Sequence, residues 1–209
     1  MNNEYQVIDT ANWKRAIHYN VFRNFMIPHI SISTELDITN FYRKTKENNL
    51  SFSFAFMYAV TKCANEIEEF RYRFYEGDVV LYNKISSTFT YMNKEAELFK
   101  VVTVPIKDDI EDYIKTAIET AKSQKEYFTG PLANNTLILS ALPWITYTHQ
   151  SNTFSGNKED AKLNIHWGKY YEKDGNLVMP FSVQAHHSFV DGLHISKLVN
   201  QLQEYIDNL

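Results

Sequence analysis

The chain has 209 residues, of which 44% are hydrophobic and 22% charged, and its formal net charge is -4. This length suffices for one domain with a substantial core, and the weakly acidic balance gives no reason to expect nucleic acid or an anionic membrane as a partner. The one cysteine, Cys63, excludes an internal disulfide and a multi-cysteine zinc site. No apolar run reaches membrane-spanning length. Residues Met1 to Tyr5 lack the features of a secretory signal, so we expect a cytoplasmic protein.

The first half of the chain predicts three helices and several strands. Hydrophobic periodicity places helices at 12–25, 38–49 and 52–67, and a short strand at 29–33. The helix at 52–67 is rich in aromatic residues, and we expect it to be buried. Two or three strands follow between residues 71 and 104, with a hairpin turn at Glu76-Gly77-Asp78.

The second half begins with a predicted amphipathic helix at 109–127. Strands follow at 136–142, 161–171 and 177–185, and a strong turn at 172–176 separates the last two. A final helix follows Gly192 with apolar residues at helical spacing, from Ile195 to Leu209. Helices and strands do not alternate strictly, which argues against a doubly wound parallel fold. We expect a single domain over residues 1–209, an α/β (α+β) two-layer sandwich in which helices cover a mixed β-sheet.

A short segment, Gln184 to Gly192, places two histidines and an aspartate where the last predicted strand passes into the last helix. Three interpretations remain open. In the first, Asp191 caps the helix and the histidines are hydrogen-bonded structural residues. In the second, His187, Asp191 and His194 bind a metal from one helix face, although Gly192 and the position of His187 before the helix count against this. In the third, His187 is a general base held rigidly beside a cleft.

The run His186-His187-x-x-x-Asp191-Gly192 resembles the HHxxxDG motif of CoA-dependent acyltransferases. Further segments resemble the chloramphenicol acetyltransferase family in its order and approximate spacing: Asn12-Trp13-x-Arg15, Asp37-Ile38-Thr39, Glu69-Phe70-Arg71, Ser140-Ala141-Leu142-Pro143-Trp144, Gly168-Lys169-Tyr170 and Leu202-Gln203-Glu204. The resemblance extends over nearly the whole chain. It implies the fold of that family and transfer of an acetyl group from acetyl-CoA to a small-molecule acceptor, without a metal.

The resemblance also implies catalytic roles. His187 would take the proton from an acceptor hydroxyl or amine as that atom attacks the thioester of acetyl-CoA. Asp191 would pair with Arg15 and hold the histidine loop in shape. Ser140 would donate a hydrogen bond to the oxyanion of the tetrahedral intermediate, whereas its plain interpretation is a hydroxyl at the end of a strand.

A path for CoA would be lined by Trp144, Lys169 and Tyr170, again by resemblance. Without it, we would interpret Trp144 as a core residue and Lys169 as a solvated lysine. The chain has no GxGxxG pattern and no P-loop, which argues against a dinucleotide and against kinase-type use of ATP.

The acceptor pocket implied by the resemblance consists of Phe22, Met26, Ile30, Phe99, Val101, Phe128 and His166. Some positions depart from the family, with Phe22 in place of a tyrosine, His166 in place of a threonine, and Gln150 and Asn152 in place of apolar residues. The wall of the pocket is therefore more polar. Three hypotheses follow: O-acetylation of chloramphenicol or a related small alcohol, the same chemistry on a more polar acceptor, or a catalytically idle trimer that binds a small ligand.

The assembly is a further expectation from the resemblance. Related condensation and carnitine enzymes contain two copies of this unit with the site between them, whereas this chain has the length of one copy. Its cleft would then form against another subunit. We expect a homotrimer with active sites at the subunit interfaces, the base of one subunit facing the acceptor pocket of the next.

Overall fold

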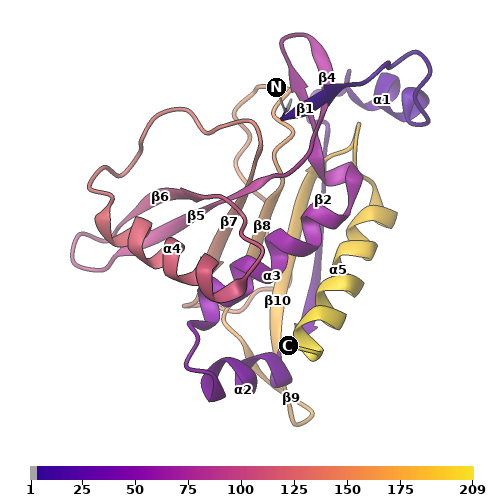
Figure 1. The fold of residues 1–209 in the computed structure, drawn as a ribbon. Coiled ribbons are helices and arrows are strands. Elements are labelled where there is room, and N and C mark those ends of the chain that lie inside the picture. The colour runs from indigo at the N-terminus through magenta and orange to yellow at the C-terminus, as the bar shows by residue number, and fades with distance from the viewer. Residues whose placement is uncertain (1–3) are drawn as a thin grey trace.

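A seven-stranded mixed sheet forms the centre of the protein, and the helices gather on one of its faces (Figure 1). The structure is a computed structural model that describes residues 4–209. Residues 1–3, which belong to the N-terminal segment considered above as a secretory signal, lie outside the described residues. The strand order is β2-β10-β8-β7-β5-β6, and the short strand β9 pairs with β10. These strands are β2 (His29–Asp37), β5 (Ser86–Asn93), β6 (Leu98–Val104), β7 (Thr136–Leu142), β8 (Asn164–Gly168), β9 (Tyr171–Lys173) and β10 (Asn176–His186).

A second, three-stranded sheet lies near the N-terminal end of the chain, in the order β1-β4-β3. Its strands are β1 (Tyr5–Val7), β3 (Tyr72–Tyr75) and β4 (Asp78–Tyr82). The helices are α1 (Ala16–Phe22), α2 (Thr39–Glu47), α3 (Phe52–Glu66), the 3-10 helix η1 (Glu68–Arg71), α4 (Ile110–Ser123) and α5 (Gly192–Asp207). None of the helices formed within residues 4–209 is long and apolar enough to cross a membrane.

The two faces of the large sheet differ in chemistry. Phe181 pairs with Trp167 in the β10–β8 ladder, and both rings contact Phe56 of α3, at 6.2 and 5.0 Å between centroids. Successive strand residues point to opposite faces, so the neighbouring row points away from the helices. That row is Ser33, Ser182, His166 and Ser140, which pair in turn across β2, β10, β8 and β7. We call the side that carries this polar row the open face.

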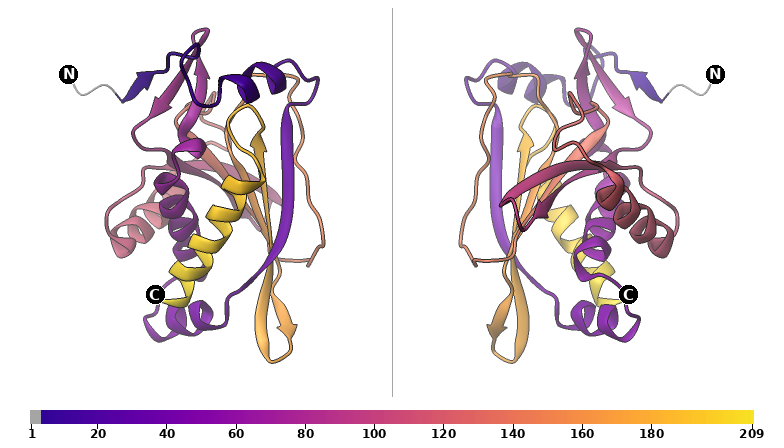
Figure 2. Two further views of the ribbon diagram at one scale, coloured as in Figure 1. Left: turned by 90° about the vertical axis from the view of Figure 1, so that its right-hand side faces the viewer. Right: turned by 90° about the vertical axis from the view of Figure 1, so that its left-hand side faces the viewer.

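The segment between β7 and β8 runs on the side of the sheet away from the helices, over part of the open face (Figure 2). The Ser31 hydroxyl donates to the Gln150 carbonyl oxygen at 3.2 Å, and the Asn152 N–H donates to the Gln184 side chain at 2.7 Å. These contacts attach the segment to β2 and β10. The part of the open face formed by β7, β5 and β6 carries a groove instead, described below.

The predicted fold class is confirmed, and several element boundaries are corrected. The strand at 136–142 has the predicted bounds, and the buried helix at 52–67 is α3. The helix predicted at 12–25 spans only Ala16–Phe22, because turns around Asp9 take up the preceding residues; the Asp9 side chain accepts from the Ala11 N–H at 3.1 Å. The helix predicted at 109–127 ends at Ser123, because Gln124 adopts an extended backbone.

The strand predictions also need correction. Residues 71–104 contain four strands, β3 to β6, rather than two or three, although the turn at Glu76-Gly77 is confirmed and both residues have positive φ. The short strand at 29–33 extends to Asp37 as β2, and the strand at 161–171 is β8 followed by the separate β9. Strand β1 was not predicted, since Tyr5–Val7 is too short for an alternating pattern.

Candidate active site

His187 lies in the turn between β10 and α5, as the sequence predicted. Its backbone N–H donates to the Pro28 carbonyl oxygen at 2.8 Å, and its ring stacks on Phe22 with 3.8 Å between centroids. The ring atom Nδ1 is 3.0 Å from the Val190 carbonyl oxygen. A carbonyl oxygen can only accept, so Nδ1 carries the proton and Nε2 has a free lone pair. This tautomer suits a general base.

Asp191 combines two predicted roles, helix cap and partner of Arg15. One carboxylate oxygen accepts from the Leu193 N–H at 3.1 Å at the start of α5, and the other accepts from Arg15 Nη1 at 3.1 Å. Arg15 is buried and also contacts the Ser188 carbonyl oxygen at 3.4 Å. Burial opposes ionisation of Asp191, but the bond from Arg15 and the nearby charges outweigh it and lower the pKa. This ion pair therefore braces the loop that carries His187.

The two histidines near His187, His186 in the same segment and His194 in α5, are engaged in structural contacts. His186 Nδ1 accepts from the Ser188 N–H at 3.2 Å, and its Nε2 donates to the Lys158 carbonyl oxygen at 2.8 Å. Burial lowers its pKa to about 4, so the ring stays neutral. His194 Nδ1 accepts from the Asp191 N–H at 3.1 Å and its Nε2 lies 3.4 Å from a Glu69 carboxylate oxygen. Within residues 4–209 no three His, Cys, Asp or Glu side chains are grouped to hold a metal ion.

Ser140 lies at a groove of about 880 Å³ on the open face. Its hydroxyl is 3.3 Å from the hydroxyl of Thr90 on the neighbouring strand β5. The groove is lined by Thr90, Met92, Lys94, Glu97, Phe99, Ser140, Ala141, Leu142, Pro143 and Trp144. A strand-end hydroxyl beside a largely apolar hollow is well placed to bond a ligand that enters it.

The chain matches the family model described as chloramphenicol acetyltransferase over residues 1–203. The chain belongs to the chloramphenicol acetyltransferase family. It is 28% identical to the chloramphenicol acetyltransferase of Proteus mirabilis over 96% of this chain and 94% of the relative, and 29% identical to that of Staphylococcus aureus over 96% and 94%. As a member of this family the chain is an acyltransferase, as predicted.

Solved structures agree with this assignment. A chloramphenicol acetyltransferase superposes with a TM-score of 0.89 and 30% identity, covering 97% of this chain and 99% of that one. A probable dihydrolipoamide acetyltransferase from Listeria monocytogenes superposes with a TM-score of 0.67 at 14% identity, over 99% and 95% of the two chains. At that identity the second likeness shows the shared fold alone.

The residues predicted for the acceptor pocket fall into separate groups. Phe22 contacts His187, and Met26 follows α1 with 79% of its surface exposed. Ile30 packs against the hydrophobic core. At the other group, Val101 pairs with Thr90 across the β5–β6 ladder, Phe99 lines the groove, and Phe128 contacts Phe99 at 6.1 Å between centroids.

His166 lies directly beside Ser140, since the two pair in the β7–β8 ladder. It is buried, its Nε2 has no hydrogen-bond partner among the described residues, and burial lowers its pKa to about 4. His166 is therefore neutral near Ser140.

The residues predicted for CoA lie at the ends of β7 and β8. Trp144 is 62% exposed at the rim of the groove, so its interpretation as a core residue is wrong. Lys169 is exposed, and its N–H donates to the Ile145 carbonyl oxygen at 2.7 Å. Tyr170 contacts the rings of Tyr42 and Phe52, at 5.3 and 6.3 Å between centroids.

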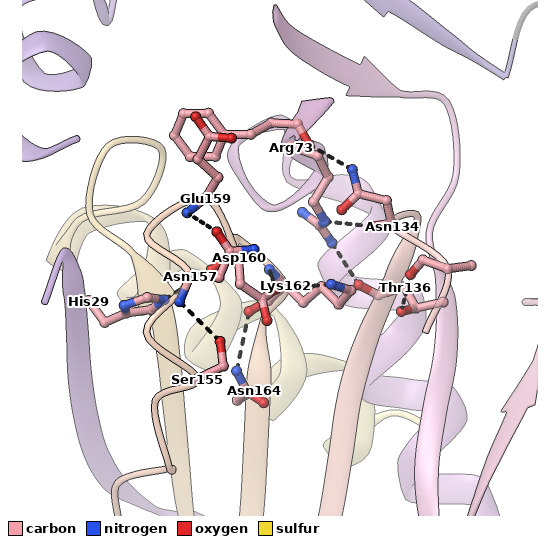
Figure 3. Close-up of polar contacts among 12 residues, drawn as sticks. His29, Arg73, Asn134, Thr136, Ser155, Asn157, Glu159, Asp160, Lys162 and Asn164 are labelled. Carbon is pink, nitrogen blue, oxygen red and sulfur yellow. Dashed lines mark hydrogen bonds and ion pairs between the residues drawn. The ribbon is translucent and has the colours of Figure 1, made fainter. Parts of the chain in front are cut away.

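A polar cluster that includes His29, Asp160, Lys162 and Arg73 was not predicted from the sequence (Figure 3), and the His29 ring lies 5.2 Å from that of His186 between centroids. His29 Nε2 is 3.0 Å from the Asp160 carbonyl oxygen, and the Asp160 side chain pairs with Lys162 at 3.0 Å. Nearby, the buried Arg73 donates to four backbone carbonyl oxygens, of Asn134, Thr136, Phe70 and Tyr72. An arginine within the buried strand β3 was the signal that could have revealed this cluster.

His187 and Ser140 are far apart within one chain. His187 follows directly on the end of β10, five residues after Ser182, and Ser182 is two strands from Ser140 through His166. At ~3.3 Å per residue and ~4.8 Å between strands, their Cα atoms are about 19 Å apart. Their side chains cannot meet across that distance, so the two predicted catalytic residues lie in separate places on one chain, which we call half-sites.

Proposed function

We propose that the protein is an acetyl-CoA-dependent O-acetyltransferase that acts on a small-molecule alcohol, chloramphenicol or a related compound. The observation that carries this proposal is the tautomer of His187, held by the Val190 carbonyl oxygen. It leaves Nε2 as a free base beside the exposed apolar side chains that follow α1. Family membership supplies the reaction class, and His187 supplies the group that such a reaction needs.

The reaction proceeds in two steps. His187 Nε2 accepts the proton of the acceptor hydroxyl as the oxygen attacks the carbonyl carbon of acetyl-CoA. Ser140 donates its hydroxyl proton in a hydrogen bond to the resulting oxyanion. The intermediate collapses by breaking the carbon–sulfur bond, and the departing thiolate takes the proton from His187. The products are the acetyl ester and free CoA, and the base is restored.

The CoA molecule would pass along Trp144, Lys169 and Tyr170. Trp144 is exposed at the rim of the Ser140 groove, and exposed aromatic side chains at a groove are typical of ligand contacts. We expect the enzyme in the cytoplasm, where acetyl-CoA is made. If chloramphenicol is the acceptor, acetylation of the drug would confer antibiotic resistance.

The two half-sites would come together in a homotrimer. Each carries exposed apolar side chains. The α1 patch beside His187 consists of Ile17, Val21, Phe25, Met26 and Ile27, and the β6 patch beside Ser140 consists of Phe99, Phe128 and Trp144. Exposed apolar patches mark association surfaces. Packing the α1 patch of one subunit against the β6 patch of the next would close a ring and bring His187 to Ser140.

A more polar acceptor is the second candidate, and the open face favours it. Gln150 and Asn152 lie over β2 and β10 through hydrogen bonds to Ser31 and Gln184, and His166 adds a neutral imidazole. Asn152 Nδ2 and His166 Nε2 are both buried without partners among the described residues. An acceptor with additional hydroxyl or carbonyl groups would suit such a wall better than an apolar one.

The test is release of free CoA from acetyl-CoA with chloramphenicol and with a panel of alcohols and amines. We expect turnover with at least one acceptor and a loss of at least about 100-fold for His187→Asn. His149→Asn is the matched control, because it removes an exposed histidine whose ring has one hydrogen-bond partner, Ser33, among the described residues. Absence of turnover with every acceptor, or equal rates for His187→Asn and the wild type, would overturn the proposal.

A further inference from the structure

The groove at Ser140 arises because two neighbouring strands separate. The parallel ladder between β5 and β7 ends at the pair Phe89–Leu139. Beyond it, β5 stays paired with β6 as far as Asn93–Leu98, while β7 stays paired with β8 as far as Leu142–Gly168. Figure 1 shows β5 and β6 turning away from β7 and β8. The groove is lined from both sides of this split.

Thr90 and Ser140 are the first residues after the last pair of that ladder. Their hydroxyl oxygens are 3.3 Å apart, and both residues line the groove. Among the described residues, the Ser140 hydroxyl has one hydrogen-bond partner, the hydroxyl of Thr90. His166, on the other side of Ser140, has its Nε2 unpartnered and leaves the serine proton free.

The direction of this hydrogen bond matters for the chemistry proposed above, on which the following inference rests. A hydroxyl has one proton to donate and two lone pairs to accept with. If Ser140 donated to Thr90, it would have no proton for the oxyanion. We propose that Thr90 is a positioning residue, which donates to Ser140 Oγ and thereby leaves the Ser140 proton directed into the groove. Charge developing on the oxyanion would strengthen both bonds, because linked hydrogen bonds polarise one another.

The test compares Thr90→Val, which keeps the shape and removes the hydroxyl, with Thr90→Ser, which keeps the hydroxyl. Losing a neutral hydrogen bond lowers a rate by about fivefold. We expect Thr90→Val to lower kcat by about this factor with KM unchanged, and Thr90→Ser to stay within about twofold of the wild type. Thr88→Val is the matched control: Thr88 lies on the same strand and face and bonds the Thr103 hydroxyl at 2.9 Å, away from the groove. It should lower the melting temperature without lowering kcat.

A second comparison separates positioning from packing. In a Ser140→Ala background, Thr90→Val should have no further effect on kcat, because its partner is gone. The same loss in both backgrounds, or a Thr90→Val enzyme with wild-type kcat, would overturn the inference. If Thr90→Val does not fold, Thr90→Ala is measured in both backgrounds under the same criteria. One outcome would refute only the role of Thr90 and leave the proposed function intact. In it, the wild type turns over, His187→Asn and Ser140→Ala are impaired, and Thr90→Val is not. A wild-type protein without turnover would refute the proposed function and this inference together.

Discussion

Mixing two inactive variants tests whether the two half-sites meet between subunits. His187→Asn removes the proposed base, and Ser140→Ala removes the proposed oxyanion donor. We expect losses of at least about 100-fold for each variant alone. In one chain the two residues are about 19 Å apart by the sheet register, so they cannot form a working site together within that chain. A site formed by His187 of the Ser140→Ala subunit and Ser140 of the His187→Asn subunit would be intact.

The size of the recovery follows from the ring. Each interface takes its histidine from one subunit and its serine from the next. Purification through two tags, one on each variant, retains only mixed trimers, with two subunits of one variant and one of the other. In either kind, one of the three interfaces combines the intact histidine with the intact serine, so about one third of the wild-type activity returns. This lies far above the roughly 1% or less expected of either parent.

The assay is thiol release after the two differently tagged variants are co-expressed and purified through both tags. A mixture of His187→Asn with the double variant His187→Asn/Ser140→Ala is the matched control, since it can form no intact interface. Recovery near one third, with none in the control, would support the shared site. If the doubly tagged oligomers form but activity stays at the parental level, the shared site is refuted.

Two further predictions concern stability. Burial lowers the pKa of His186 and His166 to about 4 from an ordinary 6.5. Between these values the unfolded chain binds protons that the folded chain does not, so the stability is full above about pH 6.5 and falls toward pH 4, by on the order of 3 kcal/mol for each histidine. Urea unfolding across this range should show the slope, and His186→Gln should reduce it; an unchanged slope would contradict the assignment. Asp191→Asn should lower the free energy of unfolding by about 2 kcal/mol and reduce turnover, because it leaves the buried Arg15 without its counter-ion. Glu47→Gln, in the exposed pair with Arg43, should change it by less than about 1 kcal/mol, and equal effects of the two would argue against a bracing role.

The sequence could predict those parts of the fold that have a strong local signal. The aromatic run of α3 and the strand Thr136–Leu142 are examples, because burial alone decides them. The start of α1 could not be predicted, since it depends on which backbone N–H groups donate hydrogen bonds to the Asp9 side chain. Local periodicity carries no information of that kind.

The site shows the same division. Placing His187 and Asp191 at the junction of β10 and α5 needed only the order of elements. The bond from Nδ1 to the Val190 carbonyl oxygen needed coordinates, as did the separation of His187 from Ser140. Thr90 was missed because a threonine in a strand has no signature until the end of the β5–β7 ladder is known.

The attachment of the segment between β7 and β8 bears on how substrate specificity could change in such an enzyme. The part of the segment around residues 149–152 is attached to β2 and β10 by hydrogen bonds at Ser31, Ser33 and Gln184, while the proposed base and oxyanion donor belong to strands and turns of the sheet. Mutation could therefore remodel the wall that meets the acceptor and leave the reacting groups undisturbed. New selectivity would cost little stability, and one reaction could be directed to many alcohols.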